Sequence, residues 1–105
     1  IVLAFGHAIQ RPYVILDTGF TGDVQVTPRM ARELGLRVRG VTPVLTATGT
    51  VSDLPVAVAV VSMEGITKYV NILISNGLPS VGISFLAKFR YRVLLDYRTI
   101  LLQRI

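Results

Sequence analysis

The sequence predicts a mainly β domain, a small closed barrel or a sandwich that carries one or two short helices. Short runs of β-branched and aromatic residues fill most of the chain, and turn residues separate them at short intervals. Only one segment carries a full set of helical signals. With 105 residues, the chain fits a single domain over residues 1–105.

The N-terminal third is expected to hold short strands followed by the helix. The expected strands cover residues 1–5, 12–16 and 23–27, with a polar, glycine-containing turn between the first two. The helix is expected over residues 28–35, because Thr27 can cap its N-terminus and Pro28 suits the first helical position. Gly35 can end this helix, which then has about two turns.

A long hairpin is expected next, over residues 37–63. Thr48 and Gly49 lie near its tip, where a positive φ is needed. Its arms contain β-branched residues, among them Thr46, Thr50 and Val51. In residues 55–61 both alternating faces are apolar, which predicts a strand that is covered on both sides.

The C-terminal half alternates between strands and turns. Glu64 and Gly65 are expected to turn the chain into a strand over residues 66–74, and a loop follows it. Residues 82–89 are apolar and form a short segment, as in one or two turns of helix. Two apolar runs on either side of residues 96–99 predict a closing hairpin.

The composition excludes several classes of site. The longest apolar run, residues 55–61, is far shorter than the roughly 18–20 residues of a membrane-spanning helix, and no signal peptide is recognisable. The chain has no cysteine, which excludes disulfides and zinc–thiolate sites and favours a cytoplasmic location. Because His7 is the only histidine, a Ser/His/Asp or Cys/His nucleophile system and a multi-histidine metal site are excluded.

The balance of apolar and charged residues points to protein partners. Hydrophobic residues make up 51% of the chain and charged residues only 16%, a surplus that favours an oligomer. The net charge of +5 raises the alternative of nucleic-acid binding. The basic residues are scattered, however, and only residues 88–92 combine basic with aromatic side chains. We therefore expect a solvated edge there, with neither a nucleic acid nor a membrane as partner.

Asp17 is the acidic residue that stands out. It directly follows an apolar run, so its carboxylate is expected to be partly desolvated and to need hydrogen bonds. Thr18 and the amides around Gly19 can supply them, because glycine permits close approach of the backbone. The other five acids lie at turns, at strand starts or on a polar helix face, where acids are ordinary: Asp23, Glu33, Asp53, Glu64 and Asp96.

Two sequence motifs carry a family resemblance. The sequence LDTG at residues 16–19, followed by FTG at residues 20–22, resembles the active-site loop of the retropepsin-like, single-domain aspartic proteases. The sequence SVG at residues 80–82, followed by ISFL, resembles the hydrophobic-Gly element before the short C-terminal helix of that family. The helical segment after the first motif is closer to the bacterial and archaeal members than to the viral ones. The order of these features covers nearly the whole chain.

The resemblance implies an aspartic endopeptidase. The family works with paired aspartates and this chain has one DTG, so the implied active form is a homodimer in which Asp17 of each subunit meets at the two-fold axis. Two carboxylates that lie within hydrogen-bond reach of each other share one proton and titrate as a pair. One would activate a water that attacks the peptide carbonyl, and the other would protonate the developing oxyanion and then the amine. Neither a metal nor an organic cofactor is implied.

Other residues take implied roles by their position in the motifs. Thr18 would brace the two active-site loops across the dimer, and the backbone of Gly19 would contact substrate. Thr48 and Gly49 would form the tip of a flap that closes over an extended peptide. Gly82 is expected to be structural. The fold implied is a closed barrel of the aspartic protease lobe type, completed as a homodimer.

Departures from the viral pattern leave alternatives open. Viral members carry an Asp four residues after the catalytic one and an Arg after the C-terminal Gly, and Thr21 and Ile83 occupy these positions here, so that ion pair is absent. The apolar closing hairpin also differs from the short viral terminal strand. The main alternative is a non-catalytic dimeric β module that binds extended peptides, and a nucleic-acid-binding barrel comes third.

Overall fold

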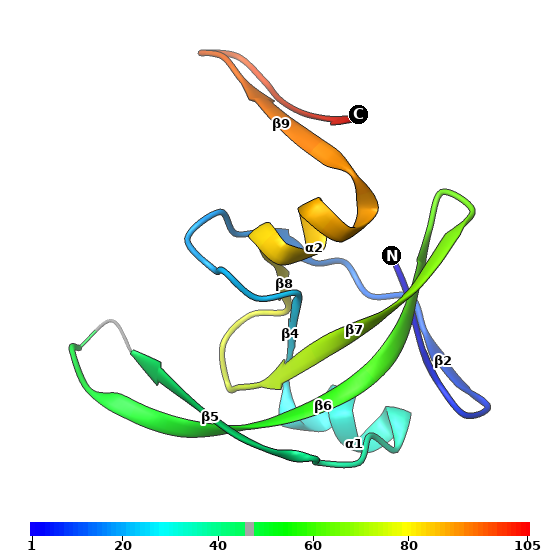
Figure 1. Cartoon of the computed structure of the whole chain (residues 1–105), viewed down its shortest axis with the longest axis vertical. Coiled ribbons are helices and arrows are strands. Elements are labelled where there is room, and N and C mark those ends of the chain that lie inside the picture. The colour runs from blue at the N-terminus through cyan, green and yellow to red at the C-terminus, as the bar shows by residue number, and fades with distance from the viewer. Residues whose placement is uncertain (46–47) are drawn as a thin grey trace.

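The computed structural model describes residues 1–45 and 48–105, and these residues form ten strands and two short helices (Figure 1). The strands are β1 (Val2–Phe5), β2 (Ala8–Gln10), β3 (Ile15–Leu16), β4 (Val24–Val26), β5 (Gly40–Leu45), β6 (Val51–Met63), β7 (Ile66–Ile74), β8 (Ser80–Val81), β9 (Tyr91–Leu95) and β10 (Ile100–Arg104). The helices are α1 (Pro28–Leu34) and α2 (Ile83–Phe89). The prediction of a mainly β chain with one or two short helices is confirmed.

Eight strands form one curled sheet that is best described as a half-barrel (Figure 1). Its order is β2-β1-β6-β7-β4-β8-β3, and β5 pairs with the far end of β6. The pairs β4–β7 and β3–β8 are parallel, and the other pairs of the sheet are antiparallel. In the described chain, the two end strands β2 and β3 do not pair with each other. The expected closure of the barrel is therefore not found within one chain, because the end strands have only three and two residues.

The N-terminal strands differ from the expectation. Residues 8–10, expected as part of a turn, form β2 and pair with β1 through Leu3 opposite Gln10 and Phe5 opposite Ala8. The strand expected over residues 12–16 begins only at Ile15. Three residues are too few to show a strand period, so the pairing with β1 creates β2 where the local sequence gives no signal. Pro12 also has no amide hydrogen to donate to a neighbouring strand.

Helix α1 forms where the sequence predicts it. The Thr27 hydroxyl accepts a hydrogen bond from the amide of Met30 at 3.2 Å, Pro28 occupies the first turn, and Gly35 ends the helix. Ala31 and Leu34 are buried on the inner face. The predicted capping residues and the predicted core face are both confirmed.

The long central hairpin is also confirmed. β5 and β6 pair from Gly40 opposite Val56 to Leu45 opposite Val51, and Gly49 in the connection has a φ of 80°. The expected arm residue Thr46 lies outside the described residues. Glu64 and Gly65 form the turn into β7, which covers residues 66–74 as predicted. β6 is thus long enough to pair with β5, β1 and β7 along its length.

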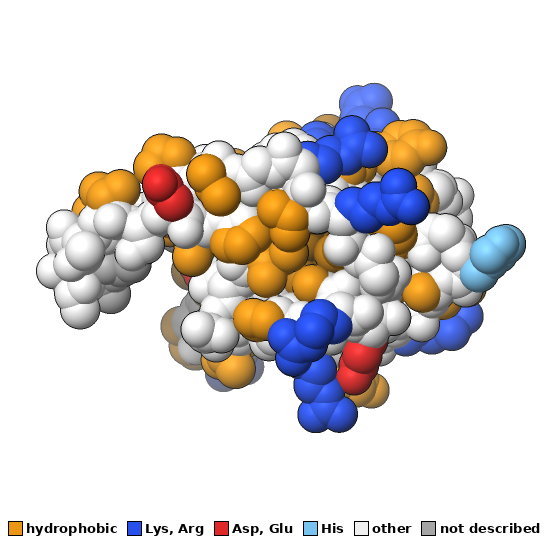
Figure 2. Space-filling view, turned by 90° about the horizontal axis from the view of Figure 1, so that it is seen from below, with side chains coloured by type: hydrophobic (Ala, Val, Ile, Leu, Met, Phe, Trp, Pro, Cys, Tyr) orange, Lys and Arg blue, Asp and Glu red, His pale blue; other side chains and the backbone are white. Residues whose placement is uncertain are grey.

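The expectation that both faces of residues 55–61 are covered is wrong for one face. Ala57, Ala59 and Val61 point inward and are buried. The alternate residues Val56, Val58 and Val60 are only half-buried, because they lie on the outer face of the curled sheet. Figure 2 shows apolar side chains reaching the surface in the middle of the face seen from below, with Lys and Arg side chains around them.

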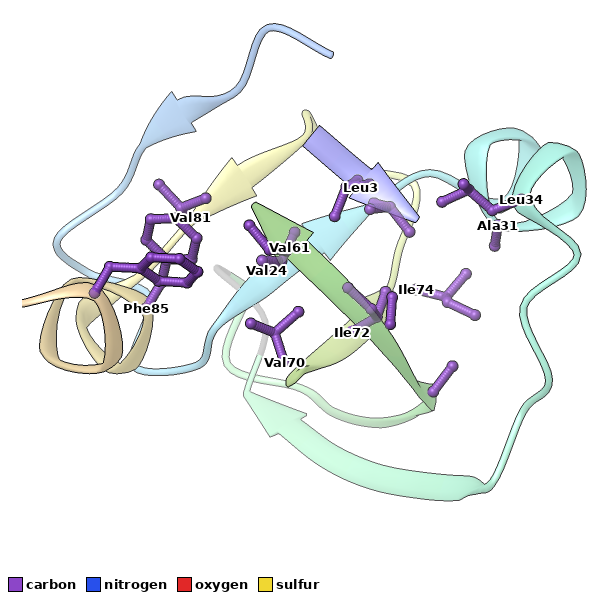
Figure 3. Close-up of a cluster of buried hydrophobic side chains, with 14 of the residues drawn as sticks. Leu3, Val24, Ala31, Leu34, Val61, Val70, Ile72, Ile74, Val81 and Phe85 are labelled. Carbon is purple, nitrogen blue, oxygen red and sulfur yellow. The ribbon is translucent and has the colours of Figure 1, made fainter. Parts of the chain in front are cut away.

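The core lies inside the curl of the sheet and joins it to both helices (Figure 3). Leu3, Val24, Val61, Val70 and Ile72 come from four different strands and are at most 1% exposed. Their burial is the main source of folding free energy, at roughly 25 cal/mol per Å² of apolar surface. In α2, two buried rings stack with centroids 4.6 Å apart (Phe85 and Phe89). β4 and α2, which flank the loop after Leu16, are therefore held by one core.

The closing hairpin forms as predicted, as a separate two-stranded sheet of β9 and β10. Its base is fixed to the body by Arg104, whose guanidinium lies 4.7 Å from the centre of the Tyr91 ring. Arg104 also donates to the Tyr91 hydroxyl at 2.8 Å and to Glu64 at 3.2 Å. In the described residues, no helix has both the length and the apolar character that crossing a membrane requires.

Candidate active site

The loop at residues 17–22 is docked on the segment between β8 and α2. Asp17 donates its amide to the carbonyl of Val81 at 3.0 Å, and Ile83 donates to the carbonyl of Phe20 at 2.9 Å. Gly82 lies between these bonds and donates to the carbonyl of Asp23 at 3.0 Å. Two backbone hydrogen bonds of the loop and one of the residue that follows it thus fix this segment against residues 81–83, where the two sequence motifs meet.

Asp17 lies at the start of this loop, directly after β3. Its Oδ1 accepts a hydrogen bond from the amide of Gly19 at 3.0 Å, and its carbonyl accepts from the amide of Phe20 at 3.1 Å. The expected contribution of the Gly19 amide is therefore found. The hydroxyl of Thr18 makes no hydrogen bond within the described part of the chain.

The carboxylate of Asp17 is exposed, which differs from the expectation of partial desolvation. The reason is its place in the sheet: β3 has two residues and is the last strand of the open edge. A side chain that follows such an edge strand has no neighbouring strand to cover it. In a single chain, the carboxylate is therefore accessible to any molecule that approaches this edge.

Asp17 lines a cleft of about 840 Å³. One wall is the loop, with Asp17 and residues 19–22, and the opposite wall is formed by residues 41–45 of β5. Residues 71–73 of β7 lie between them, and Val56 of β6 adds an apolar contact. The cleft is large enough for several residues of peptide, and its lining combines the carboxylates of Asp17 and Asp23 with both apolar and polar side chains.

The strand β5 gives this cleft an edge that can bind a peptide backbone. In the described structure β5 pairs with β6 alone, so its second edge has no strand partner. An extended segment can add to such an edge through backbone hydrogen bonds, while its side chains enter pockets on alternate sides. Pro43 interrupts the row of backbone amide donors along β5, since it has no amide hydrogen.

The residues expected at the flap tip lie apart from the cleft lining. Thr48 and Gly49 are at the end of the β5–β6 hairpin, where the hydroxyls of Thr48 and Thr50 are 3.4 Å apart. The positive φ of Gly49 fits the turn that the sequence predicts there. The structure brings Asp17 and Gly19 to the cleft, together with the arm that carries Thr48 and Gly49, and it places Gly82 behind the loop.

Asp23 is a residue of this site that the sequence does not single out, since it reads as an ordinary turn acid. It is 2% exposed and lines the inner end of the cleft. Its Oδ2 accepts from the amide of Asn71 at 2.8 Å and from the ammonium of Lys88 at 2.5 Å. These contacts join the end of the loop to the cleft floor in β7 and to α2.

The surroundings of Asp23 favour its charged form. Burial alone would raise the pKa of this carboxyl, but hydrogen bonds from Lys88, Ser84 and the Asn71 amide, with the positive charge of Lys88, hold the pKa below its ordinary value. The sequence carries little signal for this pair, since its partners lie 65 residues apart. The one available sign is that an acid directly precedes β4, in which the valines Val24 and Val26 alternate with a glutamine.

The basic segment at residues 88–92 is largely engaged by the protein itself. Lys88 is bound to Asp23, and the guanidinium of Arg92 donates two hydrogen bonds to Gln103, at 2.9 and 2.7 Å. Among the described residues, no group of three or more His, Cys, Asp or Glu side chains comes together. Asp17 is an exposed carboxylate in the lining of this cleft.

Comparison of the chain with known proteins finds no relative. The chain matches no protein-family model, and neither the curated proteins nor the solved structures contain a significant match.

Proposed function

We propose that this chain is an aspartic endopeptidase of the retropepsin-like type, active as a homodimer. The single observation that carries the proposal is the cleft, which is lined on one side by the DTG loop with its exposed Asp17 and on the other by β5, whose second edge has no strand partner among the described residues. An extended peptide can lie between them with its backbone beside the carboxylate. The lobe type and the assembly rest on the resemblance of the two motifs.

The proposed chemistry needs two solvent-accessible carboxylates side by side. In one chain, Asp17 is the exposed carboxylate of this cleft, since Asp23 is buried. A second copy, related by a two-fold axis beside the loop, brings its own Asp17 to within hydrogen-bond reach. The two carboxylates then hold one proton between them, because like charges so close cannot both ionise. The ionised carboxylate takes a proton from a water, and the water oxygen forms a bond to the peptide carbonyl carbon.

The second carboxylate then completes the reaction. It donates its proton to the oxyanion of the tetrahedral intermediate. As the carbon–nitrogen bond breaks, the first carboxyl passes the proton that it took from the water to the amide nitrogen, and a hydroxyl of the intermediate returns one proton to the second carboxylate. The products are a new carboxyl terminus and a new amine. In this proposal Thr18 and Gly19 support the loop, and the arm that ends at Thr48 and Gly49 closes over the substrate and excludes water.

A non-catalytic peptide-binding module is the second candidate, and the exposure of Asp17 favours it. A single carboxylate without a partner can bind a cation or an amide but cannot share a proton. The same cleft and the same unpaired edge of β5 would then serve to bind an extended peptide. The two candidates differ in whether peptide bonds are broken, so cleavage decides between them.

The deciding experiment is incubation of the purified chain with a mixed peptide library between pH 3 and 8, with mass spectrometry of the products. The matched control is the Asp17→Asn variant, and sedimentation measures the oligomeric state of both proteins. The proposal predicts cleavage between apolar residues, with an optimum on the acid side, that the variant loses. A folded dimer that binds peptides and leaves them intact overturns the proposal in favour of the binding module.

A further inference from the structure

A gap in the strand pairing lies along one edge of β6. On this side β6 pairs with β1 at residues 60–62 and with β5 at residues 51–56, so among the described residues 57–59 are paired only with β7. β1 and β5 both run antiparallel to β6, and they therefore follow each other in the same direction along its edge (Figure 1). Val58 lies at the centre of this gap between the end of β1 and the start of β5.

The backbone of Val58 points into the gap. In the pairing of β6 with β7, Val58 is opposite Asn71, and the Asn71 amide donates to Asp23 at 2.8 Å, on the side of β4. Residues directly opposite each other in an antiparallel pair turn their backbone groups either toward each other or both away. The amide and the carbonyl of Val58 therefore face away from β7, toward the space between β1 and β5. They are a donor and an acceptor that another chain can use.

A cavity of about 410 Å³ lies at this gap, a size that is typical of sites for small ligands. Its lining combines the apolar side chains of Phe5, Val58 and Val60 with the ring of Tyr69 and the guanidinium of Arg39. Val58 and Val60 are half-buried and Tyr69 is exposed, so a ligand can cover apolar surface here. The cavity shares no lining residue with the cleft of Asp17 and is therefore a separate site.

Arg39 is the charged residue of this lining. It lies directly before β5, where its amide donates to the carbonyl of Val56 at 2.8 Å. Its guanidinium forms no hydrogen bond or ion pair with any residue that the structure describes, and no described acid lines the cavity. A guanidinium presents a fork of donors that matches a carboxylate, and the net charge of +5 attracts anions. The cavity therefore favours a ligand that combines an apolar group with a carboxylate.

We propose that this gap binds the C-terminal residue of an extended peptide, one with an apolar last side chain and a free carboxylate. The last amide of the peptide donates to the Val58 carbonyl, and one carboxylate oxygen accepts from the Val58 amide. A peptide that runs in the direction of β1 and β5 ends toward Arg39, which binds the second carboxylate oxygen. Its last side chain lies on the same face as Val58, beside the ring of Tyr69.

The length of the gap selects a chain end over an internal segment. Three residues of a strand span only about 10 Å, and β1 and β5 limit the gap at its two ends. An internal segment has to continue past the start of β5, where Arg39 already donates its amide to Val56. A chain end stops before this point. The positive charge of Arg39 then selects a carboxyl end over an amino end.

The test is a titration of isotope-labelled protein, followed by the amide resonance of Val58 in NMR spectra. The first probe is an acetylated apolar tripeptide with a free carboxylate, the second is the same tripeptide with a C-terminal amide, and the third is hexanoate, an apolar acid without a peptide group. We expect the free acid to bind at least about 10-fold more tightly than the other two. The amidated peptide lacks the charge for Arg39, and hexanoate lacks the amide for the Val58 carbonyl.

Two substitutions show whether the charge acts from this site. Arg39→Gln should raise the dissociation constant of the free acid at least about 10-fold, because it removes a charge-assisted hydrogen bond. Arg98→Gln is the matched control, since it removes the same charge in the turn of the β9–β10 hairpin, where the guanidinium lies 5.0 Å from the centre of the Tyr97 ring. This control should stay within about twofold of the natural chain, because a distant exposed charge is screened by salt.

Four outcomes overturn the proposal. The first is a Val58 amide that does not shift at about 5 mM of the free acid, a concentration that detects millimolar binding. The others are equal binding of the acid and its amide, equal binding of the tripeptide and hexanoate, and an Arg39→Gln variant that binds like Arg98→Gln. Asp17 lies outside this cavity, so the result does not depend on whether the chain cleaves peptides.

Discussion

Gly82 and Phe20 approach each other so closely that a β-carbon on Gly82 would stand 2.3 Å from the carbonyl oxygen of Phe20. The same β-carbon would stand 2.5 Å from the carbonyl oxygen of Gly22. Both contacts are with backbone atoms of the loop that carries Asp17, so no side-chain rotation can relieve them. The position of the loop therefore depends on the absence of a side chain at residue 82, and the two sequence motifs are coupled through this contact.

Gly82→Ala is expected to displace the loop and to destabilise the fold. The new methyl group must push the backbone of residues 20–22 away, which strains the hydrogen bonds of Asp17 to Val81 and of Ile83 to Phe20. Overpacking of this kind costs about 1–3 kcal/mol, and contact with backbone places this site at the upper end. Urea unfolding measures the free energy of unfolding, and the peptidase activity of the variant shows whether the loop has moved.

Gly40→Ala is the control for this substitution. A β-carbon at residue 40 meets nothing within 4 Å, and Gly40 has no positive φ. Its replacement should leave stability unchanged or raise it slightly, because alanine loses less backbone entropy in a strand. Equal stabilities of the two variants would show that the contact between residues 82 and 20 does not position the loop.

Asp17→Asn should separate activity from stability. The side chain is exposed, and an asparagine Oδ1 can still accept the hydrogen bond from the amide of Gly19. We expect the free energy of unfolding to change by less than about 0.5 kcal/mol. Peptidase activity should fall at least about 100-fold, because the amide can neither take nor give the shared proton. Unfolding and cleavage assays on one preparation measure both quantities.

Glu33→Gln is the matched control for Asp17→Asn. It removes a carboxylate that is exposed on α1 and pairs with Arg29, outside the lining of the cleft. Its activity should stay within about twofold of the natural chain, since a surface ion pair contributes little to the fold. An Asp17→Asn variant as active as Glu33→Gln would exclude Asp17 from the chemistry.

Local signals in the sequence were sufficient to predict the bounds of several helices and strands. Thr27, Pro28 and Gly35 mark the ends of α1, and the turn at Glu64 and Gly65 marks where β6 ends and β7 begins. These features depend on residues that are close in the chain. Two short motifs marked the loop of Asp17 and a structural Gly82, but not the contact between them, which joins residues more than 60 positions apart.

The features that the sequence did not predict depend on distant contacts. β2 exists because β1 pairs with it, and residues 8–10 have no strand pattern of their own. Asp23 resembles a turn residue until Lys88 and Asn71 are brought beside it. The exposure of Asp17 follows from the open edge of the sheet, a property of the whole topology rather than of any segment.

Thr27→Ala is expected to destabilise the chain by about 1 kcal/mol. The substitution removes the hydroxyl that accepts a hydrogen bond from the amide of Met30, which is the side-chain cap of α1. Thr27→Ser keeps the hydroxyl and should retain most of the stability. Thermal unfolding of the two variants measures the difference, and equal melting temperatures would mean that this cap does not contribute.

Lys88→Met should destabilise the chain at neutral pH by about 2 kcal/mol. It leaves the buried carboxylate of Asp23 with its hydrogen bonds from Ser84 and the Asn71 amide but without its cation. Removing one partner of a fully buried pair costs about 3–5 kcal/mol, and the effect is smaller here because the Lys88 side chain is 34% exposed. Lys68→Met, a change of the same kind at an exposed residue of β7, is the control and should cost little. A Lys88 variant as stable as the Lys68 variant would contradict a structural role for the pair.

The cost of Lys88→Met should also depend on pH. In the natural chain the pKa of Asp23 is lower in the folded state than its ordinary value of 3.8, so its ionised form contributes stability at any pH well above 3.8. That contribution is lost as the pH falls through the folded pKa, because both states are then protonated. The natural chain and Lys88→Met should therefore differ most near pH 7 and converge below about pH 3.8. Urea unfolding at a series of pH values measures this, and a difference that stays constant down to acid pH would show that Lys88 acts through packing of its aliphatic stem rather than through the charge of Asp23.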